Sequence, residues 1–285
     1  MIAVTGATGQ LGRHVIEELL QRMPAGDIVA AVRDPAKAAD LAARGVVVRE
    51  ADYSRPETLR PALRGADKLL LISSSEVGQR ASQHRAVIDA ALAENIGLVA
   101  YTSVLHADTS LLTLAIEHRD TEAALRDSGL PHVLLRNGWY TENYLAALPA
   151  VLLHGAVIGA AGEGRIASAA RQDYARAAAT VLTSPEQQAG RVYELAGDDS
   201  YTLADLAAEI AAQSRKPIVY MDLSESDYTA ALVSAGVPAA FAVILAQSDV
   251  SASQGALFDD SRAMSTLIGA ATTPLATSVA HALAA

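Results

Sequence analysis

The sequence contains no cysteine, and aromatic residues account for only 4% of its 285 positions. The absence of cysteine excludes disulfides, thiolate catalysis and thiolate metal ligands. With so few aromatic residues, the core has to be built from alanine, leucine and valine, which suits helices packed on a sheet. Long apolar runs are missing too: strongly apolar runs such as residues 69–72 are far short of the roughly 20 residues that a membrane span requires.

Positive charge is scarce as well. Lysine and arginine number 22 against 32 acidic residues, for a net charge of −10, and no dense basic cluster offsets this balance. A protein that binds a nucleic-acid backbone needs a basic face, so nucleic-acid binding is disfavoured. The chain opens directly on an apolar strand, without the charged and then long apolar segments of a signal peptide. We therefore expect a soluble protein of the cytoplasm.

Hydrophobic residues make up 51% of the chain, and they occur as short apolar runs that alternate with amphipathic stretches. This alternation predicts right-handed βαβ crossovers and an α/β fold, with a Rossmann-type parallel sheet covered by helices on both faces. The predicted strands are 1–5, 28–32, 46–48, 68–72, 98–102, 132–135 and 192–195, and the predicted helices between them are 10–23, 35–44, 56–64, 79–95, 111–127, 143–154 and 173–183.

The chain changes character toward its carboxyl end. Residues 155–164 are punctuated by glycine, and from Tyr201 onward helices surround one strand candidate at 217–221, with a last helix starting at Pro274. We expect residues 1–198 to form the Rossmann-type domain, with 136–165 partly contributing to a substrate cleft. Residues 199–285 are expected to form a smaller, mostly helical substrate subdomain.

The strongest motif is V-T-G-A-T-G-Q-L-G, which places Gly6, Gly9 and Gly12 between the first strand and the first helix. In this context Gly6 permits a sharp turn, Gly9 lets the backbone approach a pyrophosphate, and Gly12 lets the helix pack closely on the sheet. The helix N-terminus adds partial positive charge for the phosphates. The alternative is an ordinary glycine-rich turn, but the position of the motif favours a bound dinucleotide.

The end of the second strand indicates which dinucleotide is bound. NAD-binding proteins place an acidic residue about 20 positions after the glycines, whereas here Val32 is followed by Arg33. A guanidinium at this point can hold a 2′-phosphate, so NADP(H) is preferred over NAD(H). The alternative for Arg33 is a solvated surface arginine. Asp34 is expected to cap the helix that begins at Pro35 rather than to contact a ribose.

Two further positions could line the dinucleotide. Asp52, after the third strand, would lie beside the adenine, or would instead cap a helix that begins at Pro56. Ser73, Ser74 and Ser75 follow the fourth strand and could line the far side of the cofactor, although loops are rich in serine in any case.

Several longer segments carry a resemblance to a known family. They include T-G-A-T-G-Q-L-G at 5–12, L-L-L-I-S-S-S-E-V-G-Q-R at 69–80, A-Y-T-S at 100–103, L-L-R-N-G-W-Y at 134–140 and E-N-Y-L at 142–145. With these segments the chain resembles the NmrA-like branch of the atypical short-chain dehydrogenases over nearly its whole length. The resemblance implies NADPH as hydride donor and a small-molecule quinone as acceptor. The cofactor contacts that it implies fall on Gly6, Ala7, Thr8, Gly9, Gln10, Leu11, Arg33, Ser73, Ser74, Ser75, Asn137, Gly138, Trp139, Tyr140, Thr141, Glu142 and Arg171.

The Tyr-x-x-x-Lys pair of short-chain dehydrogenases that act on alcohols and ketones is missing. None of the three lysines, Lys37, Lys68 and Lys216, stands four positions after a tyrosine. Quinone reduction demands less, because the aromatic ring stabilises the reduced oxygens and solvent can supply protons. Orientation of the two reactants could therefore provide most of the catalysis.

Four polar residues are candidates for a catalytic role. His118 is the first, since many NmrA-like relatives carry a lysine at this point, and a histidine can donate a proton or a hydrogen bond near neutral pH. The alternative is a surface histidine on a helix. Tyr101, Ser103 and His106 are expected to face the crevice at the carboxyl ends of the strands, or otherwise to serve as strand-end packing.

Other readings of the sequence remain open. Trp139 and Tyr140 could form an aromatic wall for a flat quinone, or Trp139 could belong to the core. No H-E-x-x-H spacing occurs, so no metal site is expected. Besides a quinone reductase, the sequence permits a reductase of triphenylmethane dyes or other electrophiles, and a non-catalytic NADP(H) redox sensor.

Overall fold

The computed structural model describes residues 1–284, which fold as two compact units. Unit 1 comprises Met1–Ala107, Ile116–Asn137 and Arg171–Tyr193. Unit 2 comprises Asp108–Ala115, Gly138–Ala170 and the chain from Glu194 onward. The sequence predicted a single boundary at residue 198. The units instead consist of several segments each, because the chain leaves unit 1 and returns to it.

Unit 1 is built on a parallel sheet with the strand order β3-β2-β1-β4-β5-β6-β8. The pairs from β3 to β6 are all parallel, with Ile2 opposite Ile28 and Lys68, for example. The predicted Rossmann-type sheet is therefore confirmed. The strands are β1 (Ile2–Thr5), β2 (Ile28–Val32), β3 (Val47–Glu50), β4 (Lys68–Leu71), β5 (Leu98–Val104), β6 (His132–Asn137) and β8 (Val192–Leu195).

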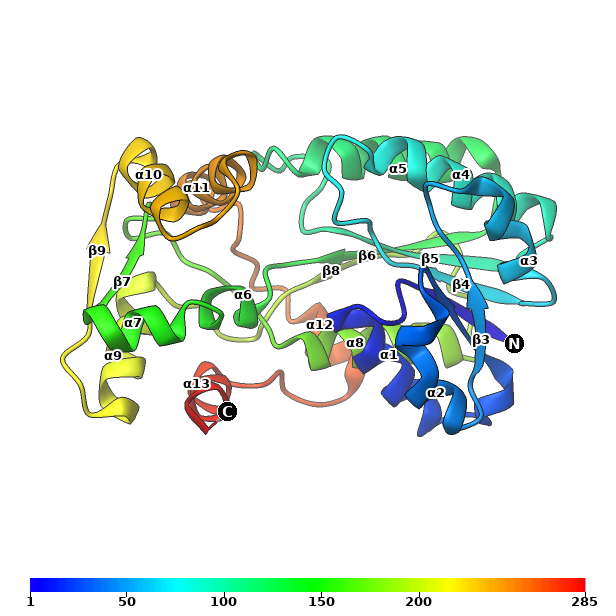
Figure 1. Cartoon of the computed structure of the whole chain (residues 1–285), viewed down its shortest axis with the longest axis horizontal. Helices are drawn as coiled ribbons and strands as arrows, with labels where there is room; N and C mark the ends of the chain where they lie inside the picture. The colour runs from blue at the N-terminus through cyan, green and yellow to red at the C-terminus, as the bar shows by residue number, and fades with distance from the viewer. Residues whose placement is uncertain (285) are drawn as a thin grey trace. The chain divides into compact units, whose positions relative to one another are not determined.

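Helices cover both faces of this sheet, as Figure 1 shows, with α3, α4 and α5 on one face and α1, α2 and α8 on the other. The covering helices are α1 (Gln10–Leu20), α2 (Ala39–Ala43), α3 (Leu59–Leu63), α4 (Arg80–Ala93), α5 (Ala115–Ser128) and α8 (Arg171–Thr183), with single 3-10 turns η1 (Ala25–Asp27), η2 (Pro35–Ala38) and η3 (Pro56–Thr58). This coverage explains why the central strands are apolar at every position rather than at alternate ones.

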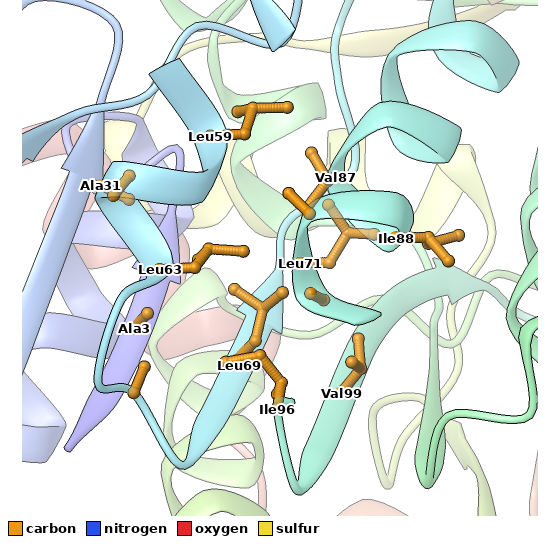
Figure 2. Close-up of a cluster of buried hydrophobic side chains, with 14 of the residues drawn as sticks. Ala3, Ala31, Leu59, Leu63, Leu69, Leu71, Val87, Ile88, Ile96 and Val99 are labelled. Carbon is orange, nitrogen blue, oxygen red and sulfur yellow. The ribbon is translucent and has the colours of Figure 1, made fainter. Parts of the chain in front are cut away.

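The core on the α3–α4 face is mostly aliphatic near the centre of the sheet. Leu69 and Leu71 of β4 and Val99 of β5 meet Leu63 of α3 and Val87 of α4 (Figure 2). All five side chains are buried. Because side chains alternate along a strand, Tyr101 lies on the same face as Val99, and this places its ring under α4 and α5.

Unit 2 carries a small second sheet, in which β7 (Ala156–Gly159) pairs in parallel with β9 (Val219–Asp222). The strand β7 was not predicted from the sequence, because glycines flank its short apolar run. The predicted helix at 143–154 is divided into α6 and α7, with Pro149 in the first turn of α7. The helices of this unit are α6 (Thr141–Leu145), α7 (Leu148–His154), α9 (Leu203–Ser214), α10 (Glu225–Ser234), α11 (Ala239–Ser253), α12 (Ala263–Ile268) and α13 (Leu275–Ala284).

Across residues 1–284, every helix is too short or too polar to cross a membrane.

Candidate functional site

The glycine-rich loop joins β1 to α1 by a tight turn. Gly6 adopts a φ of +60°, a region that side chains other than glycine rarely enter. The turn closes when the Gly9 N–H donates to the Gly6 carbonyl at 2.8 Å. Gly9 then serves as the N-cap of α1. The predicted strand-turn-helix is confirmed, and Gly6 is the residue that the turn requires.

Gly12 is required by a close approach of α1 to the segment that follows β1. A Cβ atom at Gly12 would lie 2.3 Å from the Gly6 carbonyl oxygen and 2.7 Å from the Ala7 Cα. The nearest atoms therefore belong to the loop that leads from β1 into α1. At Gly9 a Cβ would stand 3.1 Å from the same carbonyl oxygen, a tight contact with backbone.

The glycine-rich loop, which we call the phosphate loop, offers a cradle that suits a pyrophosphate. The first intrahelical bond of α1 runs from the Arg13 N–H to the Gly9 carbonyl, so the N–H groups of Gln10 and Leu11 have no acceptor within the helix. No acidic residue lies in the first turn. Exposed N–H groups and the positive end of the helix dipole attract phosphate.

Arg33 follows β2 directly, and its side chain is 72% exposed. Its Nη1 pairs with Glu76 Oε1 at 3.1 Å. The neighbouring Asp34 accepts a hydrogen bond from the Ala36 N–H at 3.1 Å and caps η2. The predicted capping role of Asp34 is therefore confirmed, and Arg33 is the cation that β2 places at the carboxyl edge of the sheet.

Asp52 and the three serines lie in loops that follow β3 and β4. The Asp52 carboxylate accepts from the Ser54 N–H at 2.9 Å, so it closes a local turn ahead of η3 rather than capping η3 itself. The Ser73 N–H donates to Thr102 Oγ1 at 2.9 Å, whereas Ser75 is exposed.

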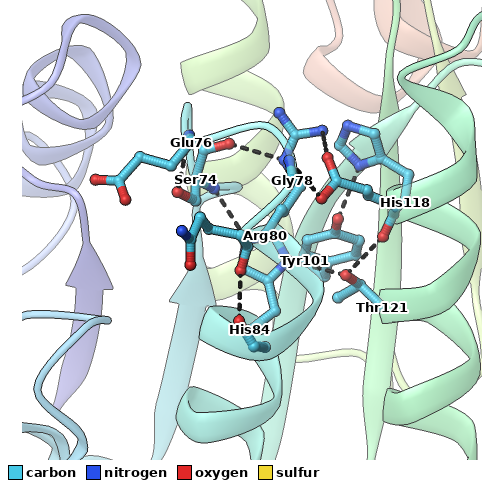
Figure 3. Close-up of polar contacts among 11 residues, drawn as sticks. Ser74, Glu76, Gly78, Arg80, His84, Tyr101, His118 and Thr121 are labelled. Carbon is cyan, nitrogen blue, oxygen red and sulfur yellow. Dashed lines mark hydrogen bonds and ion pairs between the residues drawn. The ribbon is translucent and has the colours of Figure 1, made fainter.

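A cluster of polar side chains lies between β5, α4 and α5 (Figure 3). We call it the Arg80 cluster; its members are Arg80, His84, Tyr101, Glu117, His118 and Thr121. Arg80 is only 5% exposed. Its Nε donates to the Ser74 carbonyl at 2.8 Å, and its Nη1 lies 3.6 Å from Glu117 Oε2. The other Glu117 oxygen accepts from the Gly78 N–H at 3.0 Å, so Arg80 and Glu117 together fix the serine loop.

The hydrogen bonds of His84 determine its protonation state. The backbone N–H of Ser74 can only donate, so the His84 Nε2 that it meets at 2.9 Å is unprotonated. The hydrogen is then on Nδ1, which donates to Thr121 Oγ1 at 2.9 Å. Burial, together with the Arg80 charge, lowers the pKa of His84 to about 3, in agreement with a neutral ring.

His118 is 7% exposed, so the surface-histidine alternative is wrong. Its Nδ1 lies 2.8 Å from the Tyr101 hydroxyl. Burial and the nearby Arg80 hold the pKa of His118 well below its usual value. His118 is consequently neutral at neutral pH, where it can offer a hydrogen bond but does not carry the imidazolium proton.

The other three candidate catalytic residues are placed differently from one another. Tyr101 has no exposed surface, and burial raises the pKa of its hydroxyl. Ser103 is buried and donates to Glu122 at 2.5 Å, while Arg136 binds both oxygens of the same carboxylate at 3.0 and 2.8 Å. Ser103 therefore belongs to a buried ion-pair network. His106 is half-buried just after β5, with a positive φ of 51°.

The remaining predicted cofactor contacts divide between the two units. In unit 1, Asn137 is buried at the end of β6 and Arg171 begins α8. In unit 2, Thr141 starts α6, and its hydroxyl bonds to Ser168 at 2.8 Å. Four residues around it belong to the same unit, with Gly138 buried and the others partly buried: Gly138, Trp139, Tyr140 and Glu142.

Sequence reasoning missed Arg80, His84, Glu117 and Thr121. A signal was present, because Arg80 and His84 are four residues apart on one predicted helix, and Glu117 and Thr121 are four apart on the next. Residues at this spacing share a helix face. Nothing in either segment says that the two faces meet, since that depends on how both helices pack on the sheet.

No group of three metal-binding side chains occurs within the part of the chain that the structure describes.

Comparison with known proteins places the chain in a family. The family model described as NAD(P)H-binding matches residues 6–185. The chain is 60% identical over 281 residues to quinone oxidoreductase 2 of Escherichia coli, covering 99% of this chain and 98% of that protein. The chain belongs to the NAD(P)H-binding family. Within the family, the chain is similar over its whole length to quinone oxidoreductase 2.

Solved structures agree. The E. coli NADPH-dependent quinone oxidoreductase in complex with NADPH superposes with a TM-score of 0.97 at 60% identity, over 99% of this chain and all of that chain (100%). The triphenylmethane reductase of Citrobacter sp. complexed with NADP(H) follows with a TM-score of 0.95 at 39% identity, over 99% of this chain and 100% of that chain. The resemblance drawn from the sequence motifs is thereby confirmed.

Proposed function

We propose that this protein is an NADPH-dependent quinone oxidoreductase. The observation that carries the proposal is the 60% identity to quinone oxidoreductase 2, which extends over 99% of the chain. The phosphate loop, the cation after β2 and the buried histidine on α5 all lie within the matched length. A site built from these residues can hold the cofactor and an acceptor.

The residues of unit 1 suit NADPH. The N–H groups at the start of α1 would hold the pyrophosphate, and Arg33 would hold the 2′-phosphate. The loop of Ser73, Ser74 and Ser75 and the buried Asn137 would line the rest of the dinucleotide. When bound, NADPH would supply a hydride. This hydride and one proton from solvent would convert a quinone into a hydroquinone and leave NADP⁺.

Catalysis by this chain rests on orientation more than on acid-base chemistry. Two of the three lysines are occupied elsewhere in the fold: Lys68 Nζ donates to the Leu182 carbonyl at 2.7 Å, and Lys216 Nζ donates to the Leu152 carbonyl at 3.3 Å. The third, Lys37, is exposed on η2. Holding two reactants in the right geometry can by itself supply roughly 7–11 kcal/mol of the barrier reduction.

His118 is the polar group that we assign to the acceptor. It is neutral, and a Tyr101 hydroxyl that donates to Nδ1 leaves the remaining hydrogen on Nε2. From there it can donate to a quinone oxygen as negative charge develops. Tyr101 has no exposed surface, so its part is to position His118. Ser103 is held by Glu122 and supports the strand end.

Substrate binding is assigned to unit 2. Trp139 and Tyr140 supply aromatic rings of the kind that a flat quinone packs against. The assignment of residues 199–285 to substrate binding is part of the proposal, as is a location in the cytoplasm.

Two related activities are less well supported. The triphenylmethane dye reductase is 39% identical, well below the identity to the quinone enzyme. A purely sensory protein does not require a hydrogen-bond donor to the acceptor, which is the role that we propose for His118.

The test is steady-state consumption of NADPH with and without a small benzoquinone, followed by absorbance and corrected for the protein-free reaction. We expect quinone-dependent turnover that is faster with NADPH than with NADH. A triphenylmethane dye serves as the competing acceptor. Binding of NADPH without turnover of any acceptor would favour a sensor, and turnover with the dye alone would favour a dye reductase.

A further inference from the structure

Arg33 already has a negatively charged partner within unit 1. Its Nη1 lies 3.1 Å from Glu76 Oε1. Glu76 lies in the loop after β4, 43 residues from Arg33 along the chain. The loops after β2 and β4 meet at the carboxyl edge of the sheet, where a parallel sheet binds its ligand. The carboxylate thus stands where a 2′-phosphate would meet the same guanidinium.

The Glu76 carboxylate is held in this position from behind. Its second oxygen accepts from Gln83 Nε2 at 2.8 Å, and the same amide nitrogen lies 3.1 Å from Ser54 Oγ. Gln83 is only 5% exposed, on the first turn of α4. The Glu76 N–H also bonds to Ser74 Oγ at 3.1 Å. Glu76 is therefore attached to the fold at its backbone and at its head group, unlike a freely moving surface glutamate.

We propose that Glu76 limits the preference for NADPH over NADH by competing with the 2′-phosphate for Arg33. This inference rests on the proposed use of NADP(H). A phosphate that binds Arg33 must displace the carboxylate or lie beside it, and two like charges at one guanidinium repel each other. NADH, which has no 2′-phosphate, leaves the pair intact. Glu76 consequently reduces the difference in binding affinity between NADPH and NADH that Arg33 creates.

The effect has a bounded size, because both partners are partly exposed. An exposed ion pair contributes little to binding, but the phosphate also loses a repulsive neighbour when the carboxylate is removed. We therefore expect Glu76→Gln to tighten binding of 2′-phosphorylated ligands about threefold to tenfold. Glutamine keeps the shape of the side chain and can still meet Gln83.

The experiment compares two small probes that isolate the phosphate. Dissociation constants of adenosine 2′,5′-bisphosphate and of 5′-AMP are measured by calorimetry for the wild type and for Glu76→Gln. The proposal predicts tighter binding of the bisphosphate alone. Unchanged or weaker binding of the bisphosphate, or equal tightening of both probes, overturns it.

A matched control removes the same charge elsewhere. The Glu17 carboxylate pairs with Arg44, and its side chain is 44% exposed, as that of Glu76 is. Glu17→Gln should change neither probe. If Glu17→Gln tightens the bisphosphate as much as Glu76→Gln does, net charge is responsible and the proposal fails.

Arg33→Ala separates this inference from the one on which it rests. If Arg33→Ala removes the preference for the bisphosphate and Glu76→Gln has no effect, Arg33 holds the phosphate but Glu76 does not compete. If Arg33→Ala itself leaves the preference intact, the assignment of the 2′-phosphate site is wrong. The quinone activity is measured independently of both results.

Discussion

The phosphate loop and the Arg80 cluster lie at the carboxyl edge of the same sheet, yet they are built in opposite ways. The loop consists of backbone: Gly6 turns with a positive φ, and Gly12 brings α1 against the loop. The cluster consists of side chains from three elements, and their chemistry depends on burial. Arg80 and His118 are both more than nine-tenths buried.

This difference decides how each region tolerates change. The backbone site depends on glycine at positions 6, 9 and 12, so a Cβ added at any of these three positions disturbs it. A buried side-chain site depends on neighbours that hold each group in one protonation state. The following substitutions test the two kinds of site against each other.

The largest effect is expected in the loop. Gly12→Val forces a side chain into the space 2.3 Å from the Gly6 carbonyl oxygen, so α1 has to move away from the loop. We expect NADPH binding to be lost in calorimetry while circular dichroism still reports a folded sheet. Gly26→Ala is the control, since a Cβ there meets nothing within 4 Å. Wild-type affinity in Gly12→Val would refute the loop assignment.

Arg33→Ala tests the phosphate partner at the next strand. Loss of a charge-assisted hydrogen bond removes about 1.5–3 kcal/mol of binding. Because the Arg33 side chain is 72% exposed, we expect an effect at or below the lower end of this range, roughly tenfold or less. The KM for NADPH should rise by that amount, and the KM for NADH should hardly change. Equal losses for both cofactors would show that Arg33 holds something other than the 2′-phosphate.

His118→Ala tests the cluster. Since a neutral His118 donates only a hydrogen bond, we expect kcat to fall on the order of tenfold, below the roughly 10²–10⁴ of a committed general acid. Tyr101→Phe should have a smaller effect of the same kind. The kcat of the wild type should be flat from pH 6 to pH 8. A thousandfold loss in His118→Ala, in a folded protein that binds NADPH, would make His118 an acid catalyst.

The buried histidine His84 gives the cluster a pH dependence in stability. Its pKa is lowered to about 3 in the folded protein, against about 6.5 in the unfolded chain. The unfolded state therefore binds more protons, and stability is lost as pH falls below about 6.5, by up to about 1.4 kcal/mol per pH unit. The free energy of unfolding, measured by urea titration at several pH values, should fall less steeply with decreasing pH in His84→Gln than in the wild type.

The exposed His281 serves as the control for this experiment. Between pH 4 and pH 6, the free energy of unfolding of His281→Gln should change with pH as it does in the wild type. If His84→Gln also shows the same change with pH as the wild type, other groups govern the acid sensitivity.

The sequence predicted the backbone site and the strands better than the cluster. The spacing of Gly6, Gly9 and Gly12 predicts a loop because glycine acts through its own conformation. Arg33 could be found because it follows a recognisable strand. The neutral state of His118 could not be predicted, because it depends on burial by elements that are far apart in the chain.

Two other differences have local causes. The strand β7 was missed because Gly155 and Gly159 flank its short apolar run, and it is stabilised by pairing with β9. The Glu76 partner of Arg33 was missed because the two residues are 43 positions apart in the sequence. Only the order of the strands in the sheet brings the loops after β2 and β4 together.

Hydride transfer from NADPH to a quinone is best tested by a single turnover with the protein in excess over a small benzoquinone. We expect one NADP⁺ for each hydroquinone and a slower reaction when the transferred hydrogen of NADPH is deuterium. We also expect that Gly12→Val abolishes the reaction, whereas His118→Ala only slows it. Protein that binds NADPH but leaves the quinone oxidised, or that forms hydroquinone without consuming NADPH, would contradict the account.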